Sequence, residues 1–104
     1  MRDSEKIYEI VYGKTFGEYE LPDLEEVIHP LEVRFERNGL SPDKVFSGKR
    51  CLDAGCGNGR GAFFMLRHGA AWVEAIDVSE NNVASTRRFA EELGYGNHIK
   101  VARS

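Results

Sequence analysis

Two aspartates and a run of glycines are the residues of this chain whose types and spacing could do chemistry. Asp53 closes a short apolar segment and is followed by glycine at every second position, Gly55, Gly57, Gly59 and Gly61. Glycine has no Cβ, so such a turn can bend sharply and let a ligand approach the backbone. If the turn opens a helix, its N–H groups and the helix macrodipole favour negative charge. We therefore expect bare N–H groups here and a nucleotide-like ligand.

Asp77 is the second candidate carboxylate. It closes another apolar segment and follows Gly59 by 18 residues. In nucleotide-binding βαβ units an acidic side chain about 20 residues after the glycine turn binds the ribose hydroxyls. Open parallel sheets bind ligands at the carboxyl ends of their strands, where both Asp53 and Asp77 are expected to lie. A carboxylate would repel a 2′-phosphate, so the pattern predicts an unphosphorylated ribose.

The glycine turn leaves two ligand classes open. The spacing Gly57-x-Gly59-x-x-Ala62 fits the short dinucleotide fingerprint, which favours a nicotinamide-dependent oxidoreductase. Asp53 stands two residues before the first glycine, where a carboxylate would repel a pyrophosphate and suit a cationic ligand. A cationic nucleoside cofactor is therefore the principal hypothesis, and the oxidoreductase is the alternative.

The elements that must position these residues follow from the hydrophobic pattern. An alternation of strands and helices predicts right-handed crossovers in a parallel sheet with flanking helices, which is the α/β class. In the helix expected between Ser79 and Gly94, the inner positions should be Val83, Ala84, Phe89, Ala90 and Leu93. The expected elements are a strand at 49–53, a helix with its apolar face at 62–66 that ends at 68–69, a strand at 70–76, a helix capped by Ser79 that ends at Gly94, and a strand from Ile99.

The first 48 residues are predicted to form a helical segment ahead of this unit. Residues 3–12 have helical spacing, and 13–20 read as a loop that could be a flap over a ligand. A second helical stripe runs from Pro22 to a stop at 38–39, and Pro30 either kinks it or starts a new helix. Residues 41–43, Ser-Pro-Asp, have the chemistry of a turn.

Composition limits the partners. The chain has 104 residues, 41% of them hydrophobic, and a formal charge of −3, so no basic excess indicates nucleic acid or an anionic membrane. It contains neither a span of about 20 apolar residues nor a signal-peptide pattern, which predicts a cytoplasmic location. Cys51 and Cys56 have no metal-ligand spacing and are expected to be reduced, so no metal site is predicted.

The motifs Asp53-x-Gly55-x-Gly57-x-Gly59 and Ala75-Ile76-Asp77-Val78-Ser79 closely resemble motifs I and II of the class I S-adenosylmethionine-dependent methyltransferases. The resemblance covers about residues 49–101, and the two motifs agree in both sequence and spacing. It implies a Rossmann-like fold, S-adenosylmethionine as cofactor and S-adenosylhomocysteine as product. It also implies methyl transfer to an acceptor that the motifs do not identify, for which a small molecule is favoured.

The resemblance also implies roles for single residues. The backbone from Ala54 through Gly55, Cys56 and Gly57 to Gly59 would line the methionine part of the cofactor. Asp53 would lie near the cofactor's amino-acid moiety, Asp77 would bind the ribose hydroxyls, and Val78 would lie against the adenine.

The chain departs from the family pattern at its end. Members of the family have a larger sheet, whereas Ser104 falls near the third expected strand, and only Arg103-Ser104 could replace the acidic motif that usually follows. We expect one partial domain, with a helical cap segment at 1–48 and a cofactor-binding unit at 49–104. No catalytic base is assigned, although His29 or Tyr12 could approach the site. A non-catalytic cofactor-binding or assembly module is a further alternative, and an unpaired sheet edge would allow self-association.

Overall fold

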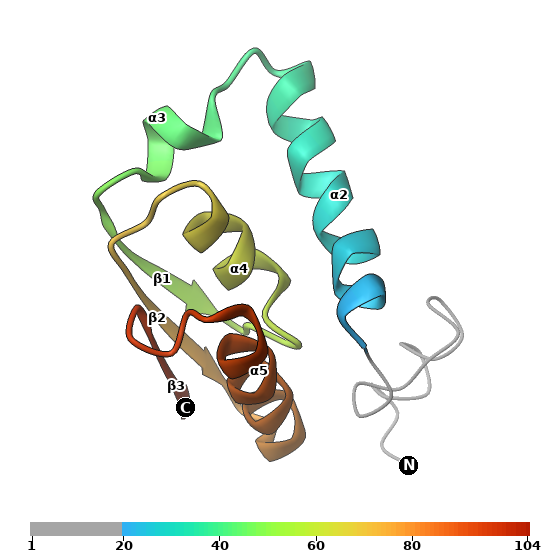
Figure 1. The fold of residues 1–104 in the computed structure, drawn as a ribbon, viewed down its shortest axis with the longest axis vertical. Coiled ribbons are helices and arrows are strands. Elements are labelled where there is room, and N and C mark those ends of the chain that lie inside the picture. Colours follow the sequence, from blue (N-terminus) through green and yellow to red (C-terminus); the bar gives the residue numbers. More distant parts are fainter. Residues whose placement is uncertain (1–19) are drawn as a thin grey trace.

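The computed structural model describes residues 20–104, which form four helices and three strands (Figure 1). The helix predicted over 3–12 and the loop predicted over 13–20 lie outside the described residues, except for Glu20. The elements in chain order are α2 (Leu21–Arg37), α3 (Pro42–Phe46), β1 (Arg50–Ala54), α4 (Arg60–Arg67), β2 (Trp72–Asp77), α5 (Glu80–Leu93) and β3 (Ile99–Arg103).

The three strands form one parallel sheet in the order β1-β2-β3. Asp53 pairs with Ala75 across β1 and β2, and Asp77 pairs with Arg103 across β2 and β3. The connecting helices α4 and α5 both lie in front of the strands in Figure 1. The predicted α/β, Rossmann-like fold is therefore confirmed, and the carboxyl ends of all three strands lie along one edge of the sheet.

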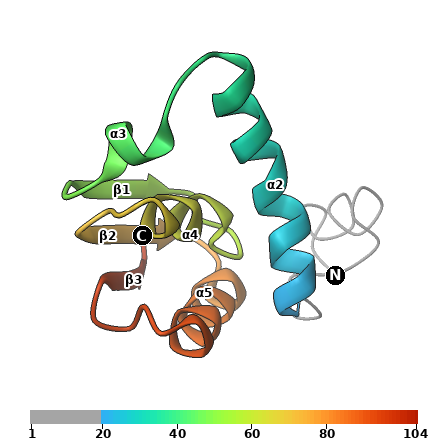
Figure 2. The same ribbon diagram turned by 45° about the horizontal axis from the view of Figure 1, so that its top comes forward.

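The core lies between the sheet and the helices. Inward side chains of the strands alternate with outward ones, so Val73 and Ala75 are fully buried whereas Leu52 is 63% exposed on the opposite face. Figure 2 shows α2 crossing the end of the layer that α4 and α5 form. The buried apolar side chains from the helices are Leu24, Val27, Ile28, Ala62, Phe63, Phe64, Leu66, Val83, Phe89 and Ala90.

One of the inner positions predicted for α5 is wrong. Ala84 is exposed, while Val83, Phe89 and Ala90 are buried and Leu93 is partly buried against the core. The inner face of α5 instead includes three polar residues, Asn82, Ser85 and Thr86. A hydrophobic pattern selects apolar residues, so it could not locate a face that is polar where the helix meets the strand ends.

α2 is a single helix that continues through Pro30, which settles the choice between one helix and two. It begins in a capping box in which the Glu20 N–H donates to Asp23 Oδ2 at 2.9 Å, and it ends at Asn38 as predicted. Pro30 is on the exposed side of the helix. Proline has no N–H to donate to the preceding turn, and the loss of that hydrogen bond is tolerated on the exposed side. The buried apolar side chains on the other side of α2 pack against α4.

Residues 41–43 do not form an isolated turn, because they begin the short helix α3. Ser41 is the N-cap, its hydroxyl accepts from the Lys44 N–H at 3.4 Å, and Pro42 occupies the first turn. Ser, Pro and Asp suit a helix start as well as a turn, so local chemistry alone did not separate the two. The rings of Phe35, Phe46 and Phe64 then pack together with centroids 5.0–5.7 Å apart, which joins α3 to α2 and α4.

Candidate functional site

The glycine turn between β1 and α4 is built on left-handed backbone. Gly55, Gly57 and Gly59 have φ values of 74°, 58° and 97°. A Cβ on Gly59 would lie 2.4 Å from a ring carbon of Phe63, which is closer than any real contact. Glycine is therefore required at Gly59 by both backbone angle and space. The turn packs directly onto the first turn of α4.

Four N–H groups of this turn donate within the protein, so the expectation that they are bare is wrong for these four. The Gly55 and Cys56 N–H groups donate to the Ile76 carbonyl at 2.8 and 2.9 Å. The Gly57 N–H donates to Asp77 Oδ2 at 2.9 Å, and the Gly59 N–H donates to the Cys56 carbonyl at 2.8 Å. The turn folds onto the end of β2, where backbone donors must find protein partners. Beside these four donors, the carboxylates of Asp53 and Asp77 lie at the adjoining strand ends.

Asp53 lies against the first turn of α4. Its Oδ2 accepts from the Ala62 N–H at 2.9 Å, and a Cβ on Gly61 would approach that oxygen to 3.1 Å. Burial raises the pKa of the Asp53 carboxyl, opposed by the Ala62 N–H and by the charge of Arg60. Gly61 is thus the residue that lets the carboxylate approach the helix.

Asp77 joins the glycine turn to α5. The side chain is 7% exposed, and its oxygens accept from the N–H groups of Gly57 and Ser79 and from Nδ2 of Asn82, at 2.9, 2.8 and 3.1 Å. Burial alone would raise the pKa of this carboxyl, but these donors hold it below its ordinary value. The carboxylate is therefore kept charged, and it has a clear structural role. A ribose hydroxyl would have to share oxygens that the protein already uses.

The inner face of α5 contributes site residues that the sequence reasoning missed. Thr86 is fully buried and donates from Oγ1 to the Gly57 carbonyl at 2.9 Å. Asn82 supports Asp77, and its Oδ1 is a buried side-chain oxygen without a hydrogen-bond partner among residues 20–104. The sequence signal that could have located these residues is the polar stripe at positions 82, 85 and 86, on the side of α5 that faces the sheet.

Cys56 is part of the support beneath the turn. It is 4% exposed, and its Sγ lies 3.7 Å from Oγ1 of Thr86. Burial raises the pKa of the Cys56 thiol to about 11. Both cysteines are free, so Cys56 acts as a small buried side chain under the turn rather than as a nucleophile.

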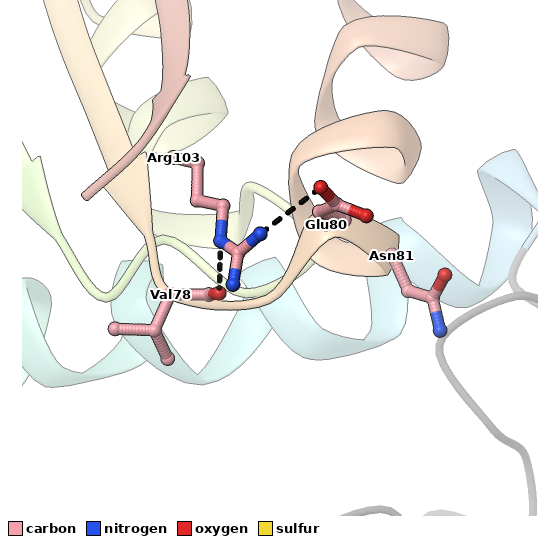
Figure 3. Close-up of a pocket in the computed structure, with 4 residues that line it drawn as sticks. All are labelled: Val78, Glu80, Asn81 and Arg103. Atoms are coloured by element: carbon pink, nitrogen blue, oxygen red, sulfur yellow. Dashed lines mark hydrogen bonds and ion pairs between the residues drawn. The ribbon is translucent and has the colours of Figure 1, made fainter.

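Val78 and Arg103 meet beside Asp77 at the ends of β2 and β3. Val78 is 71% exposed, which is unusual for an apolar residue of this size. With Glu80, Asn81 and Arg103 it lines a hollow of about 210 Å³ (Figure 3). Val78 is thus exposed beside the predicted ribose site, whereas Ala54, also exposed, lies at the end of β1.

The structure does not bring a histidine to this site. His29 is exposed on α2 and lines a hollow formed by that helix itself, with Val33 and Arg37. Tyr12, the other residue considered as a base, is outside the described residues. Residues 20–104 contain no cluster of three His, Cys, Asp or Glu side chains that could hold a metal ion. Nor does this part of the chain include a helix long and apolar enough to cross a membrane.

A parallel Rossmann-like sheet with a glycine turn after its first strand and acidic residues at two strand ends defines a nucleoside-cofactor-binding domain. Residues 51–104 match the family model described as "Methyltransferase domain", which is more than half of the 104-residue chain. The chain therefore belongs to the methyltransferase-domain family, and by family it is a class I S-adenosylmethionine-dependent methyltransferase.

Individual relatives agree with the family assignment. A ubiquinone biosynthesis O-methyltransferase of Neisseria meningitidis is 49% identical over 63 residues, which cover 61% of this chain and 25% of the relative. The S-adenosyl-L-methionine-dependent Diels-Alderase iliD of a Neonectria species is 35% identical over 89% of this chain and 39% of the relative. This chain thus spans about a quarter to two fifths of the length of these relatives.

A solved structure shares the fold. The Trypanosoma brucei PRMT1 enzyme-prozyme complex with AdoHcy matches 59% of this chain and 19% of that chain, with 28% identity and a TM-score of 0.56. The glycine turn and both strand ends fall within the family match, so the site described above lies in the part of the chain that the family shares.

Proposed function

We propose that this chain binds S-adenosylmethionine at the glycine turn and belongs to an enzyme that transfers its methyl group. The observation that carries the proposal is the arrangement of hydrogen-bonding and charged groups at the turn. Four of its N–H groups are consumed within the protein, while two carboxylates, Asp53 and Asp77, stand at the adjoining strand ends. Such a site suits a ligand with cationic groups and hydroxyl donors better than it suits a pyrophosphate.

The residues of the site fit the parts of that cofactor. Asp53 would hold the ammonium of the amino-acid moiety, and the backbone of the turn would line the methionine chain. Asp77 would accept from the ribose hydroxyls. A hydroxyl there would also offer a donor to Asn82, whose Oδ1 has no partner within residues 20–104. Val78, 71% exposed, would lie against the adenine.

When bound, S-adenosylmethionine supplies an electrophilic methyl group on a positively charged sulfur. What this chain contributes is binding and orientation, because an in-line displacement depends on how the acceptor and the methyl carbon are aligned. We propose a small-molecule acceptor, which agrees with the O-methyltransferase name of a relative that is 49% identical over 63 residues. The chain spans a quarter of that relative's length, so the acceptor pocket would include residues beyond this chain.

A second candidate keeps the cofactor and changes the reaction. The relative that matches 89% of this chain is named an S-adenosyl-L-methionine-dependent Diels-Alderase, and a Diels-Alder cycloaddition transfers no methyl group. The same site would then bind the cofactor without consuming it. Release of S-adenosylhomocysteine during turnover of the complete enzyme distinguishes methyl transfer from cycloaddition.

Calorimetric titration tests the binding proposal. The wild-type chain should bind S-adenosylhomocysteine and show no comparable affinity for NAD. Asp53→Asn keeps an oxygen for the Ala62 N–H and removes the charge, so the affinity for S-adenosylhomocysteine should fall about tenfold or more. Glu36→Gln, which removes an exposed charge from α2, is the matched control and should bind as the wild type does. Tighter binding of NAD, or binding of neither compound, would overturn the proposal.

A further inference from the structure

The two outer strands of the sheet present different edges to another chain. Figure 2 shows β1 and β3 at opposite ends of the sheet, with α5 beside β3. Within residues 20–104 each of these strands has a neighbouring strand on one side only. The backbone N–H and C=O groups on the other side of such a strand can pair with a strand of another molecule. The hydrogen bonds to β2 show which groups these are.

In β3 the outward groups include those of Val101. The His98 carbonyl accepts from the Val73 N–H at 2.9 Å, so it points toward β2. The Ser104 N–H donates to the Asp77 carbonyl at 2.9 Å and points the same way. The backbone groups of successive residues alternate between the two sides of a strand. Because Val101 is three residues from both His98 and Ser104, its N–H and C=O point away from β2.

Arg87 of α5 occupies this outer edge. Its Nη2 donates to the Val101 carbonyl at 2.8 Å. A hollow of about 250 Å³ adjoins the contact, and it is lined by both Arg87 and Glu91, which is one turn further along α5. The Glu91 side chain lies against the chain just before β3, because a Cβ on Gly96 would approach its Oε1 to 2.9 Å. A strand that joined β3 would have to displace the guanidinium from the Val101 carbonyl and pass two charged side chains.

The outer edge of β1 is different. The Lys49 carbonyl and the Gly55 N–H bond toward the β2 side at 2.9 and 2.8 Å, so by the same alternation the backbone groups of Leu52 face outward. The Leu52 side chain is 63% exposed. Arg50, the cation of this strand, lies over the ring of Trp72 in β2, with Cζ 5.9 Å from the ring centroid. Its charge is therefore directed over the neighbouring strand rather than over the outer edge.

We propose that Arg87 closes the outer edge of β3, so that a second copy of this chain pairs with the sheet through β1 alone and association stops at a dimer. Two copies that meet through β1 use the same edge in both, which is a closed two-fold contact. If β3 were also open, β1 of one copy could pair with β3 of the next. Such a head-to-tail contact can continue from copy to copy into a filament. Arg87 thereby limits the size of the assembly.

Sedimentation velocity and hydrogen exchange together test this inference. Concentrated wild-type protein should contain dimers and no larger species. Its Leu52 amide should exchange more slowly than in dilute solution, while its Val101 amide should exchange at an unchanged rate. Arg87→Met removes the donors and keeps a long side chain, so species larger than a dimer should appear. In that variant the exchange of the Val101 amide should slow about tenfold on concentration, and Arg87→Ala should give the same result.

Arg88→Met is the matched control, because Arg88 is the next residue on α5 and its Nε lies 3.9 Å from Glu92 of the same helix. It adds the same apolar side chain and should associate as the wild type does, and thermal unfolding should show that the variants are folded. The inference is wrong if both Arg87 variants form the same species as the wild type, or if they form larger ones while the exchange of Val101 stays unchanged. Species larger than a dimer in the wild type, or slowed exchange of its Val101 amide, would also overturn it.

Discussion

Gly59 is the residue at which the conformation of the turn is most tightly determined. Its φ of 97° disfavours any side chain, and a Cβ would lie 2.4 Å from the ring of Phe63. Gly59→Ala should therefore lower the free energy of unfolding by about 3 kcal/mol or more, the sum of backbone strain and a core clash. Urea denaturation followed by circular dichroism measures this loss.

Gly94 provides the control for that substitution. It also has a positive φ, 80°, but a Cβ there would meet nothing within 4 Å. Gly94→Ala should cost only the backbone strain, about 1 kcal/mol. Equal losses for the two variants would show that the contact with Phe63 has no part in selecting glycine at Gly59.

The two cysteines should differ in reactivity. Cys56 is 4% exposed and its pKa is raised to about 11, so at pH 8 almost none of it is thiolate. Cys51 is only partly buried on β1. Iodoacetamide should therefore modify Cys51 first in the native protein and both thiols in denaturant, which mass spectrometry can follow. Equal rates of modification in the native protein would contradict the packing described for Cys56.

At the scale of single residues, the sequence predicted the glycine turn and the aspartates beside it, but not the hydrogen-bond partners of the turn. The alternation of glycines after Asp53 is local, and so is the distance to Asp77, and both predicted where the site lies. Which N–H groups stay free depends on the Ile76 carbonyl, which another strand brings to the turn. That contact is tertiary, so the prediction of bare N–H groups failed for four of them, while the prediction of a cationic ligand rested on Asp53 and did not depend on it.

At the scale of elements, the side chain of His68 links the helices α2, α3 and α4. It lies at the C-terminal end of α4, with Nε2 at 2.8 Å from Glu32 of α2 and Nδ1 at 2.6 Å from Asp43 of α3. Arg67 also pairs with Glu25 and Glu32 of α2. Burial opposes the charged form of His68, but the two carboxylates prevail and raise its pKa above 6.5. The protonated ring can donate to both partners at once.

The sign of the pH dependence follows from that shift. The pKa of His68 is higher in the folded chain, so its stabilisation is complete below about pH 6.5 and is lost as pH rises through the folded pKa. His68→Gln should cost about 1 kcal/mol at pH 6, because Asp43 is largely exposed, and less at pH 9. Urea unfolding at both pH values measures the difference. A loss that is the same at pH 6 and pH 9 would contradict it, and His29→Gln on the exposed side of α2 is the control.

The helix α5, which has strong local signals at both ends, was predicted well, whereas the short helix α3 was not. Ser79 and Gly94 bound α5 as expected, since a cap and a left-handed glycine act locally. α3 has five residues, fewer than two turns, and it is held by the contacts of Phe46 with Phe35 and Phe64. No local pattern contains that packing, so the sequence indicated only a turn at this place.

At the scale of the whole molecule, the sheet is covered on one face only by the elements described. β1 pairs with β2 on one side, and within residues 20–104 its other side has no partner strand. Leu52 of this strand is 63% exposed, while Ile76 of β2 and Ala102 of β3 are partly exposed. An unpaired strand edge beside an apolar surface is a template for pairing with another chain.

We therefore predict that this chain self-associates through β1 at high concentration. Leu52→Lys should raise the dissociation constant of the dimer about tenfold or more, because symmetric pairing would bring two lysines together in place of an apolar contact. Sedimentation velocity over a range of concentrations measures the constant, and Leu40→Lys, an exposed apolar residue between α2 and α3 that is not part of the sheet, is the control. If both variants associate as the wild type does, β1 is not the contact. A chain that stays monomeric at every concentration would contradict the prediction.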